Sequence, residues 1–98
     1  RCWFVKIKNI SLLESKGNYT QVFFDNNKPL VQKSLNHFES VLDSSLFLRI
    51  NRHQIINLNF IDKVVSWFNG KLKLKLKSGI EIEVSRRQTD RIKDLFRF

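Results

Sequence analysis

The alternation of apolar and charged residues near the C-terminal end constrains the fold of this 98-residue chain more than any other feature. The runs KLKLKLK (71–77) and IEIEV (80–84) both place apolar residues at every second position. A period of two is typical of β-strands that bury one face, and a short Gly-containing segment between two such runs predicts an antiparallel hairpin. With DKVVSWF (62–68) before them, these runs predict a three-stranded antiparallel meander.

Asn69-Gly70 sets the expected register of the first hairpin. This dipeptide favours a two-residue type I′ turn, because both central residues of that turn need positive φ angles. The resulting register places apolar residues opposite each other in two pairs: Trp67 with Leu72, and Val65 with Leu74.

The second turn follows from side-chain parity. A two-residue loop at Ser78-Gly79 would set Leu76 opposite Glu81 and mix the two faces of the sheet. A three-residue loop at 77–79, with Gly79 in the left-handed conformation, keeps the apolar face continuous. The expected pairs are Leu76 with Ile80, Leu74 with Ile82, Lys75 with Glu81, and Lys73 with Glu83.

Short strands rich in β-branched and aromatic residues are expected in the first third of the chain. Asp25, Asn26 and Asn27 are turn formers that predict a hairpin, and Pro29 restricts the returning strand to a sheet edge or a strand start. The expected strands are CWFVKIK (2–8), ISLLES (10–15), NYTQVFF (18–24) and KPLVQK (28–33).

Two segments predict helices. In SLNHFESVLD (34–43), Ser34 is the expected N-cap, and the apolar residues recur at helical spacing. SRRQ (85–88) has the Ser-x-x-Gln form of a capping box, which makes Ser85 the expected N-cap of a C-terminal helix. The expected buried faces are Leu35, Phe38 and Leu42 in the first helix, and Ile92, Leu95 and Phe96 in the second. The fold class is therefore mostly β, with antiparallel sheets or meanders, one short internal helix and a C-terminal helix.

Composition limits the class of protein. A hydrophobic share of 42% in 98 residues fits one globular domain, 1–98. The single Cys2 excludes an internal disulfide framework and fits a reducing, cytoplasmic compartment. No apolar run approaches the ~20 residues that span a bilayer. The chain has no Met and begins at Arg1, so we expect it to be a piece of a longer protein.

The positive charge is uneven. Residues 49–98 hold twelve Lys/Arg against five Asp/Glu, a net charge of +7, whereas residues 1–48 have a net charge of +2. This excess predicts a polyanionic partner: nucleic acid first, and an anionic membrane second. The lysines of KLKLKLK are an obvious candidate DNA track, but alternating lysines are also how exposed β-faces stay soluble. We favour the second interpretation of that stripe.

The residue types that catalysis needs are scattered. Two His and one Cys lie far apart in the sequence and do not make a metal site. The three glycines stand alone at 17, 70 and 79, so there is no phosphate-binding Gly-rich loop. We expect no enzyme activity, no cofactor and no metal ion.

Three polar clusters remain, and each falls on a connection between expected elements. They are ESKGNYT (14–20), RINRHQ (49–54) and VSRRQ (84–88). All are rich in hydrogen-bond donors, as a surface that reads the acceptors of bases and phosphates should be. Loops at one end of a sheet scaffold can converge on a ligand. The alternatives are a solvated loop at 49–54, and a loose surface pair at Arg86 and Arg87 offset by Asp90.

These segments carry a resemblance to a known family. ISLLESKGNYTQVFF, then SLNHFESVLDSSLFLRINRHQIINLNFIDKV, then LKLKSGIEIEVSRRQ resemble, in order and spacing, the LytTR (LytR/AlgR-type) DNA-binding domain of bacterial transcription regulators. The resemblance implies a mostly antiparallel β fold whose loops enter successive major grooves on one side of double-stranded DNA. It also implies a two-component response regulator with an N-terminal receiver domain, promoter direct repeats as targets, and a homodimer on DNA. The rival function is a basic protein-interaction or membrane-associated sensory module on the same scaffold.

The resemblance assigns roles by position. The family motif Phe-x-Arg-x-His-Arg-Ser before an aliphatic pair and Asn is matched from Phe47 to Asn57, with Asn51 where His is common and His53 where Ser is common. Arg52 then falls on the loop that reaches DNA, and the motif Ser-Arg matches Ser85-Arg86. The residues expected to read bases are Arg52, Arg86, Asn18 and Tyr19. The residues expected to contact phosphates are Lys16, Asn51, His53, Ser85 and Arg87, and Gln54 is expected to project towards DNA as well.

Overall fold

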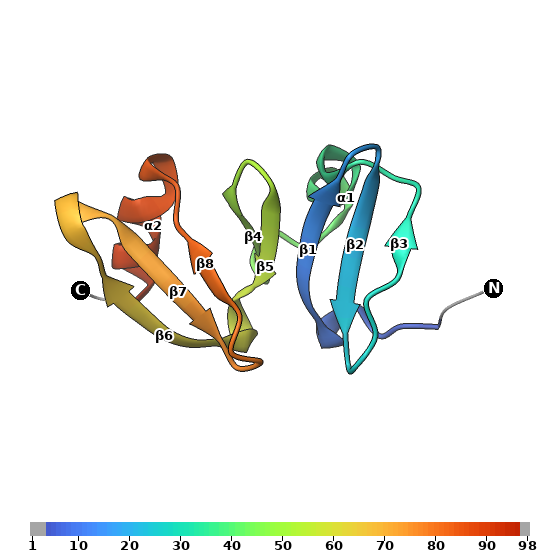
Figure 1. Cartoon of the computed structure of the whole chain (residues 1–98), viewed down its shortest axis with the longest axis horizontal. Helices are drawn as coiled ribbons and strands as arrows, with labels where there is room; N and C mark the ends of the chain where they lie inside the picture. Colours follow the sequence, from blue (N-terminus) through green and yellow to red (C-terminus); the bar gives the residue numbers. More distant parts are fainter. Residues whose placement is uncertain (1–3, 97–98) are drawn as a thin grey trace.

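Two antiparallel sheets and two α-helices make up the chain in the computed structural model, which describes residues 4–96 (Figure 1). The five-stranded sheet has the order β3-β2-β1-β5-β4, and the three-stranded sheet has the order β6-β7-β8. No helix among residues 4–96 is long and apolar enough to cross a membrane. The mostly β fold class expected from the sequence is confirmed.

The five-stranded sheet and α1 form the N-terminal half of the chain. Three hairpins, β1–β2, β2–β3 and β4–β5, make up the sheet. Its strands are β1 (Ile10–Lys16), β2 (Tyr19–Phe24), β3 (Leu30–Val31), β4 (Phe47–Asn51) and β5 (Gln54–Asn57). The β2–β3 hairpin was expected, and β3 begins directly after Pro29 at the sheet edge, as the missing N–H of proline requires. α1 (Leu35–Val41) is capped by Ser34, whose Oγ accepts a hydrogen bond from the His37 N–H at 3.0 Å.

The three-stranded sheet and the second helix form the C-terminal half. The strands are β6 (Ile61–Ser66), β7 (Leu72–Leu76) and β8 (Glu81–Glu83), and α2 (Arg86–Phe96) follows. Three short 3-10 helices complete the chain: η1 (Ile7–Asn9), η2 (Leu58–Phe60) and η3 (Phe68–Gly70). Ser85 caps α2, because its Oγ accepts from the Gln88 N–H at 3.3 Å.

The five-stranded sheet separates two apolar clusters, because successive side chains of a strand point to opposite faces. Leu13 and Ile55 pack with α1, while their neighbours Leu12 and Ile56 pack against the three-stranded sheet and α2. The order of layers is therefore α1, the five-stranded sheet, and then the three-stranded sheet with α2. The second cluster also holds the apolar residues of the meander and Ile92 of α2: Leu72, Leu74, Leu76, Ile82 and Val84.

The second turn of the meander forms as expected. Leu74 pairs with Ile82, Lys75 with Glu81 and Lys73 with Glu83. Gly79 has φ +96°, and the Leu76 N–H donates to the Ile80 carbonyl at 2.8 Å. The observed ion pair is diagonal, however: Lys73 Nζ lies 3.2 Å from Glu81 Oε1.

The register expected for β6 and β7 is wrong by one residue. Asn69 and Gly70 do adopt positive φ angles of 60° and 72°, but Phe68 is an additional residue in the connection. The Trp67 N–H therefore donates to the Lys71 carbonyl at 2.7 Å, and Val64 pairs with Leu74. A one-residue shift exchanges the faces of a strand, so Val65 and Trp67 are 49% and 39% exposed.

Two other expectations need correction. The strand expected at 2–8 is not formed by its described residues: Ile7–Asn9 is a 3-10 helix, held by the buried Asn57 amide, which donates to the Lys8 carbonyl at 3.1 Å. In α2, Ile92 is buried as expected, but Leu95 and Phe96 are 49% and 39% exposed. Thr89, one turn before Ile92 and Lys93, takes the remaining buried position instead.

Candidate nucleic-acid interface

The three polar clusters lie at the same edge of the molecule. The β1–β2 turn, the β4–β5 loop and the start of α2 all lie along the upper edge in Figure 1. Strand direction explains this: β1, β4 and β8 end at that edge, and the residues that follow each strand gather there. Lys16 and Arg86, 70 positions apart in the sequence, are thereby brought to one surface.

Direct hydrogen bonds join the β4–β5 loop to its neighbours on both sides. The Ser15 N–H donates to the His53 carbonyl at 2.9 Å, and Ser15 Oγ lies 3.1 Å from His53 Nδ1. On the other side, the Ser85 N–H donates to the Ile50 carbonyl at 3.0 Å. The loop therefore has fixed positions relative to the β1–β2 turn and to the first turn of α2.

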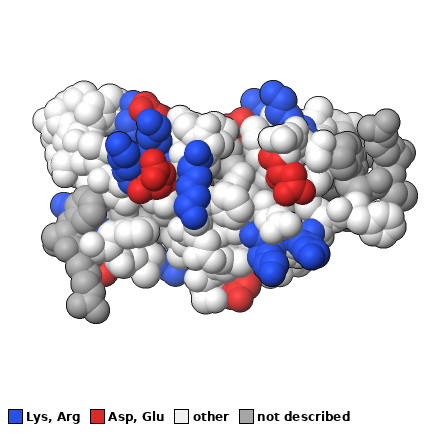
Figure 2. Space-filling model, turned by 90° about the horizontal axis from the view of Figure 1, so that it is seen from below, with Lys and Arg blue, Asp and Glu red and all other residues white. Residues whose placement is uncertain are grey.

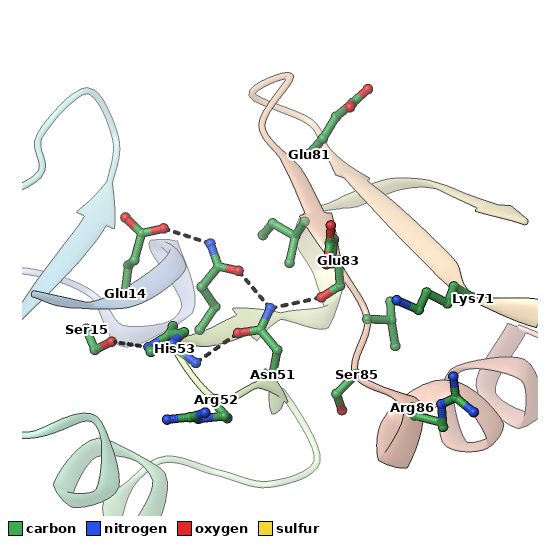
Figure 3. Close-up of a pocket in the computed structure, with 13 residues that line it drawn as sticks. Glu14, Ser15, Asn51, Arg52, His53, Lys71, Glu81, Glu83, Ser85 and Arg86 are labelled. Atoms are coloured by element: carbon green, nitrogen blue, oxygen red, sulfur yellow. Dashed lines mark hydrogen bonds between the residues drawn. The ribbon is translucent and has the colours of Figure 1, made fainter. Parts of the chain in front are cut away.

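A chain of side-chain hydrogen bonds crosses the same surface (Figure 3). Asn51 Nδ2 donates to the Glu83 carbonyl at 2.9 Å and to Gln54 Oε1 at 2.8 Å. Gln54 Nε2 donates in turn to Glu14 Oε2 at 2.7 Å. Glu14 Oε1 lies 3.1 Å from Lys16 Nζ, so the chain ends in the β1–β2 turn.

Arg49 holds the β4–β5 loop against α1. Its guanidinium donates to the Arg52 carbonyl at 2.6 Å and the Asn51 carbonyl at 3.2 Å. The same group donates to Asn36 Oδ1 and Glu39 Oε1 of α1, both at 2.8 Å. Five donors in a fixed planar fork suit this task. Residues 49–54 were alternatively expected to form a solvated loop, but the Arg49 side chain is hydrogen-bonded within the protein.

The cationic side chains that were expected at DNA lie on this framework and are exposed. Among residues 4–96, the guanidiniums of Arg52, Arg86 and Arg87 make no hydrogen bond or ion pair within the chain. The ion pair that would offset Arg86 with Asp90 is likewise not formed in this part of the chain. These charges are free to meet an external partner. Asn18, in the β1–β2 turn, and Tyr19, the first residue of β2, are exposed too.

Two hollows lie between these groups. The larger, about 700 Å³, has Glu14 and Ser15 on one side, Lys71 and Arg86 on the other, and the β4–β5 loop between them (Figure 3). The smaller, about 410 Å³, is lined by Arg49, Asn51, Arg52, Ser85, Arg87, Gln88 and Glu39. Arg86 and Arg87 therefore lie at different hollows, as expected for adjacent residues about 100° apart on a helix.

The opposite face of the molecule has a different character. Figure 2 is seen from below Figure 1, and its Lys and Arg side chains form separate groups with Asp and Glu among them. Large uncharged areas divide these groups. A mixed surface of this kind favours solubility over the binding of an extended polyanion.

Three residues organise this surface: Glu14, Gln54 and Arg49. Sequence reasoning assigned no role at the surface to Glu14 or Arg49, and it predicted that Gln54 projects towards DNA, whereas its amide donates to Glu14. Each is polar and only partly exposed. The available signal was their position at strand ends inside the polar clusters. Their partners could not be found by spacing, because Glu14 and Gln54 are 40 residues apart in the sequence.

Groups of acidic, His and Cys side chains that could hold a metal ion are absent from residues 4–96. What the fold and the surface define is a small basic module that presents three donor-rich connections on one edge of a β scaffold.

Comparison with known proteins identifies the family of this module. The family model of the LytTr DNA-binding domain matches residues 1–97, and the chain belongs to this family. The LytTr DNA-binding domain of a putative methyl-accepting/DNA response regulator from Bacillus cereus has the same fold, with a TM-score of 0.84 and 26% sequence identity. That match covers 96% of this chain and 86% of the other.

Curated relatives are longer than this chain. The transcriptional regulatory protein LytR of Staphylococcus aureus (strain N315) is 32% identical over 82 residues, which cover 84% of this chain and 33% of that protein. The sensory transduction protein LytR of Staphylococcus haemolyticus is 36% identical over 86 residues, 88% of this chain and 34% of that protein. The chain thus spans about a third of the length of these relatives.

Proposed function

We propose that this chain binds double-stranded DNA sequence-specifically and regulates transcription, through a surface made by the β1–β2 turn, the β4–β5 loop and the start of α2. The observation that carries the proposal is the fixed arrangement of these three connections, each with unpaired donors, in a member of a DNA-binding domain family. Groove edges and phosphates present acceptors, so a donor-rich surface is complementary to them.

The roles of the side chains are assigned by their positions in the family motif. Arg52, Arg86, Asn18 and Tyr19 read base edges in the major groove, where a guanidinium fork suits guanine O6 and N7. Phosphates are met by Lys16, His53, Ser85 and Arg87. Asn51 is left out of this second group, because both its Nδ2 hydrogens already have acceptors within the chain.

The wider context rests on the family. The 98 residues form one domain, the output domain of a cytoplasmic two-component response regulator whose N-terminal receiver domain lies outside this chain. The greater length of the relatives supports this arrangement. Target sites are promoter direct repeats, occupied by a homodimer whose loops enter successive major grooves on one side of the duplex.

Selection from random duplexes tests the function. The selected site should bind far more tightly than a scrambled duplex of equal length. If about five of the cationic groups of the chain neutralise phosphates, log affinity should fall with log salt at a slope of about −5, from ~0.9 per neutralised phosphate. Equal binding to both duplexes and to anionic vesicles would instead indicate a charge-driven surface, and a slope near zero would exclude phosphate contacts.

The adjacent arginines of α2 test the division of roles. Arg86→Ala should cost ~1–3 kcal/mol on the selected site and flatten the preference at one base pair. Arg87→Ala should weaken both duplexes by similar factors and make the salt slope shallower by roughly one. Arg86→Lys should not restore discrimination, because an ammonium cannot copy the fork. If Arg87→Ala removes the base preference and Arg86→Ala keeps it, the two roles are exchanged.

A further inference from the structure

The side chains of Asn51, Gln54 and Glu14, here called the amide relay, have one consistent set of hydrogen-bond directions. The Glu14 carboxylate and the Glu83 carbonyl can only accept. Gln54 must therefore turn its Nε2 to Glu14, which leaves its Oε1 to accept from Asn51. Asn51 Nδ2 donates both to Gln54 and to Glu83, and its Oδ1 accepts from the His53 N–H at 2.9 Å.

This relay touches all three connections of the proposed surface. Its Glu83 end lies two residues before Ser85, at the approach to α2. Its Glu14 end pairs with Lys16, the last residue of β1 before the β1–β2 turn. Asn51 and Gln54 flank Arg52 and His53 in the β4–β5 loop, and Asn51 Oδ1 fixes the backbone between them. Breaking one contact in the centre would remove the side-chain link between the connections and leave only the backbone hydrogen bonds of Ser15 and Ser85 to hold them.

The side-chain amides of the relay donate hydrogen bonds to acceptors within the chain. Gln54 and Asn51 are partly buried, and their contacts at 2.7–2.9 Å use both Nδ2 hydrogens of Asn51, and one Nε2 hydrogen and the Oε1 of Gln54. A phosphate would have to displace the Glu83 carbonyl or Gln54 to reach Asn51. Lost intramolecular partners are costly to replace in a partly buried site.

We propose that Asn51, Gln54 and Glu14 are positioning residues that set the spacing of the three connections, so that bases read by different connections are recognised together. This inference rests on the proposed DNA binding. Unlike Arg52, Asn51 and Gln54 then act through their neighbours and make no contact with DNA, which differs from the DNA contacts expected for both from the sequence.

A charge-neutral exchange tests the relay. Gln54→Glu puts two carboxylates where a 2.7 Å contact now exists, and should lower the ratio of selected-site to scrambled-site affinity at least tenfold. Adding Glu14→Gln restores one donor facing one carboxylate, and the pair keeps the net charge of the unmodified protein. The double variant should recover the ratio to within about threefold, with the salt slope of the unmodified protein.

Gln21→Glu is the matched control. Gln21 lies opposite Glu14 on β2, as Gln54 does on β5, but its amide donates to the Lys28 carbonyl at 3.0 Å and has no link to Asn51. This variant makes the same chemical and charge change beside Glu14. It should weaken both duplexes equally and leave their ratio unchanged. If Gln21→Glu lowered the ratio as much as Gln54→Glu does, the added negative charge alone would explain both results. The positioning role of the relay would then be refuted.

A second measurement needs no substitution. In ¹H–¹⁵N spectra, the side-chain amide signals of Asn51 and Gln54 should keep their hydrogen-bonded shifts when the selected duplex is added. Large shifts of the Asn51 side-chain amide would show a direct DNA contact and contradict the inference, as would failure of the double variant to recover discrimination. If the unmodified protein shows no base preference at all, the proposed function fails. The relay is then still judged without DNA, by whether Gly17 and Arg86 amide shifts move in Gln54→Glu and return in the double variant.

Discussion

Val64 and Val65 of β6 offer a matched test of the meander register. Val64 is partly buried against the larger core cluster, and Val65 on the next position is 49% exposed. Val→Ala removes two methyl groups, worth ~0.8 kcal/mol each when fully buried, so partial burial of Val64 gives a cost of about 1 kcal/mol. Val65→Ala should stay within about 0.5 kcal/mol. The loss of β-propensity is common to both and cancels in the difference.

Thermal unfolding followed by circular dichroism can resolve this difference. For a domain of this size, 1 kcal/mol shifts Tm by ~4–8 °C, so Val64→Ala should melt several degrees below Val65→Ala. The register expected from a two-residue Asn69-Gly70 turn reverses the order, because it sets Val65 opposite Leu74 on the apolar face. A lower Tm for Val65→Ala would therefore refute the observed register.

Two further predictions concern the core and pH. Leu74 is fully buried, so Leu74→Ala should cost ~2–5 kcal/mol in unfolding free energy, whereas Lys75→Ala should cost little, and equal Tm values would mean that the faces are assigned wrongly. Hydrogen bonds from the Ser45 hydroxyl and N–H lower the pKa of Asp43. The ionised carboxylate therefore stabilises the turn after α1, and this stabilisation is lost as the pH falls through the lowered pKa. Ser45→Ala should raise the pKa of Asp43 towards its ordinary value in an NMR titration, and an unchanged pKa would contradict the assignment.

The two turns of the meander show which features of the fold the sequence could specify. The loop at 77–79 was predicted correctly because apolar alternation and two Lys–Glu pairs constrain the same register. At Asn69-Gly70 the positive φ angles were also predicted correctly. The register there was not, because local turn preference does not reveal that Phe68 leaves the ladder. Trp67 and Phe68 are both apolar and both partly exposed, so the alternation of apolar and polar residues does not show which of them faces the core.

The candidate surface was predictable to a similar extent. The three clusters were identified from their many hydrogen-bond donors at strand ends. The resemblance to the LytTR family then assigned roles at DNA to their residues. The ties between them were not predictable: Arg49 reaches Glu39 of α1, and Asn51 reaches Glu83, which is 32 residues away. The first contact depends on how α1 packs beside β4 and the second on how the two sheets pack together, and no periodicity within one segment encodes either.

An NMR titration with the selected duplex tests most directly whether the three connections form the DNA-binding surface. Backbone amide signals of residues 15–19, 51–54 and 85–88 should shift together on addition of the duplex. Signals of the partly exposed Lys73 and Lys75 of β7, and of the η1 and η2 segments on the opposite side, should change little. Shifts concentrated on β7 with none at 51–54 would contradict the account, because the lysine stripe would then be the DNA-binding surface.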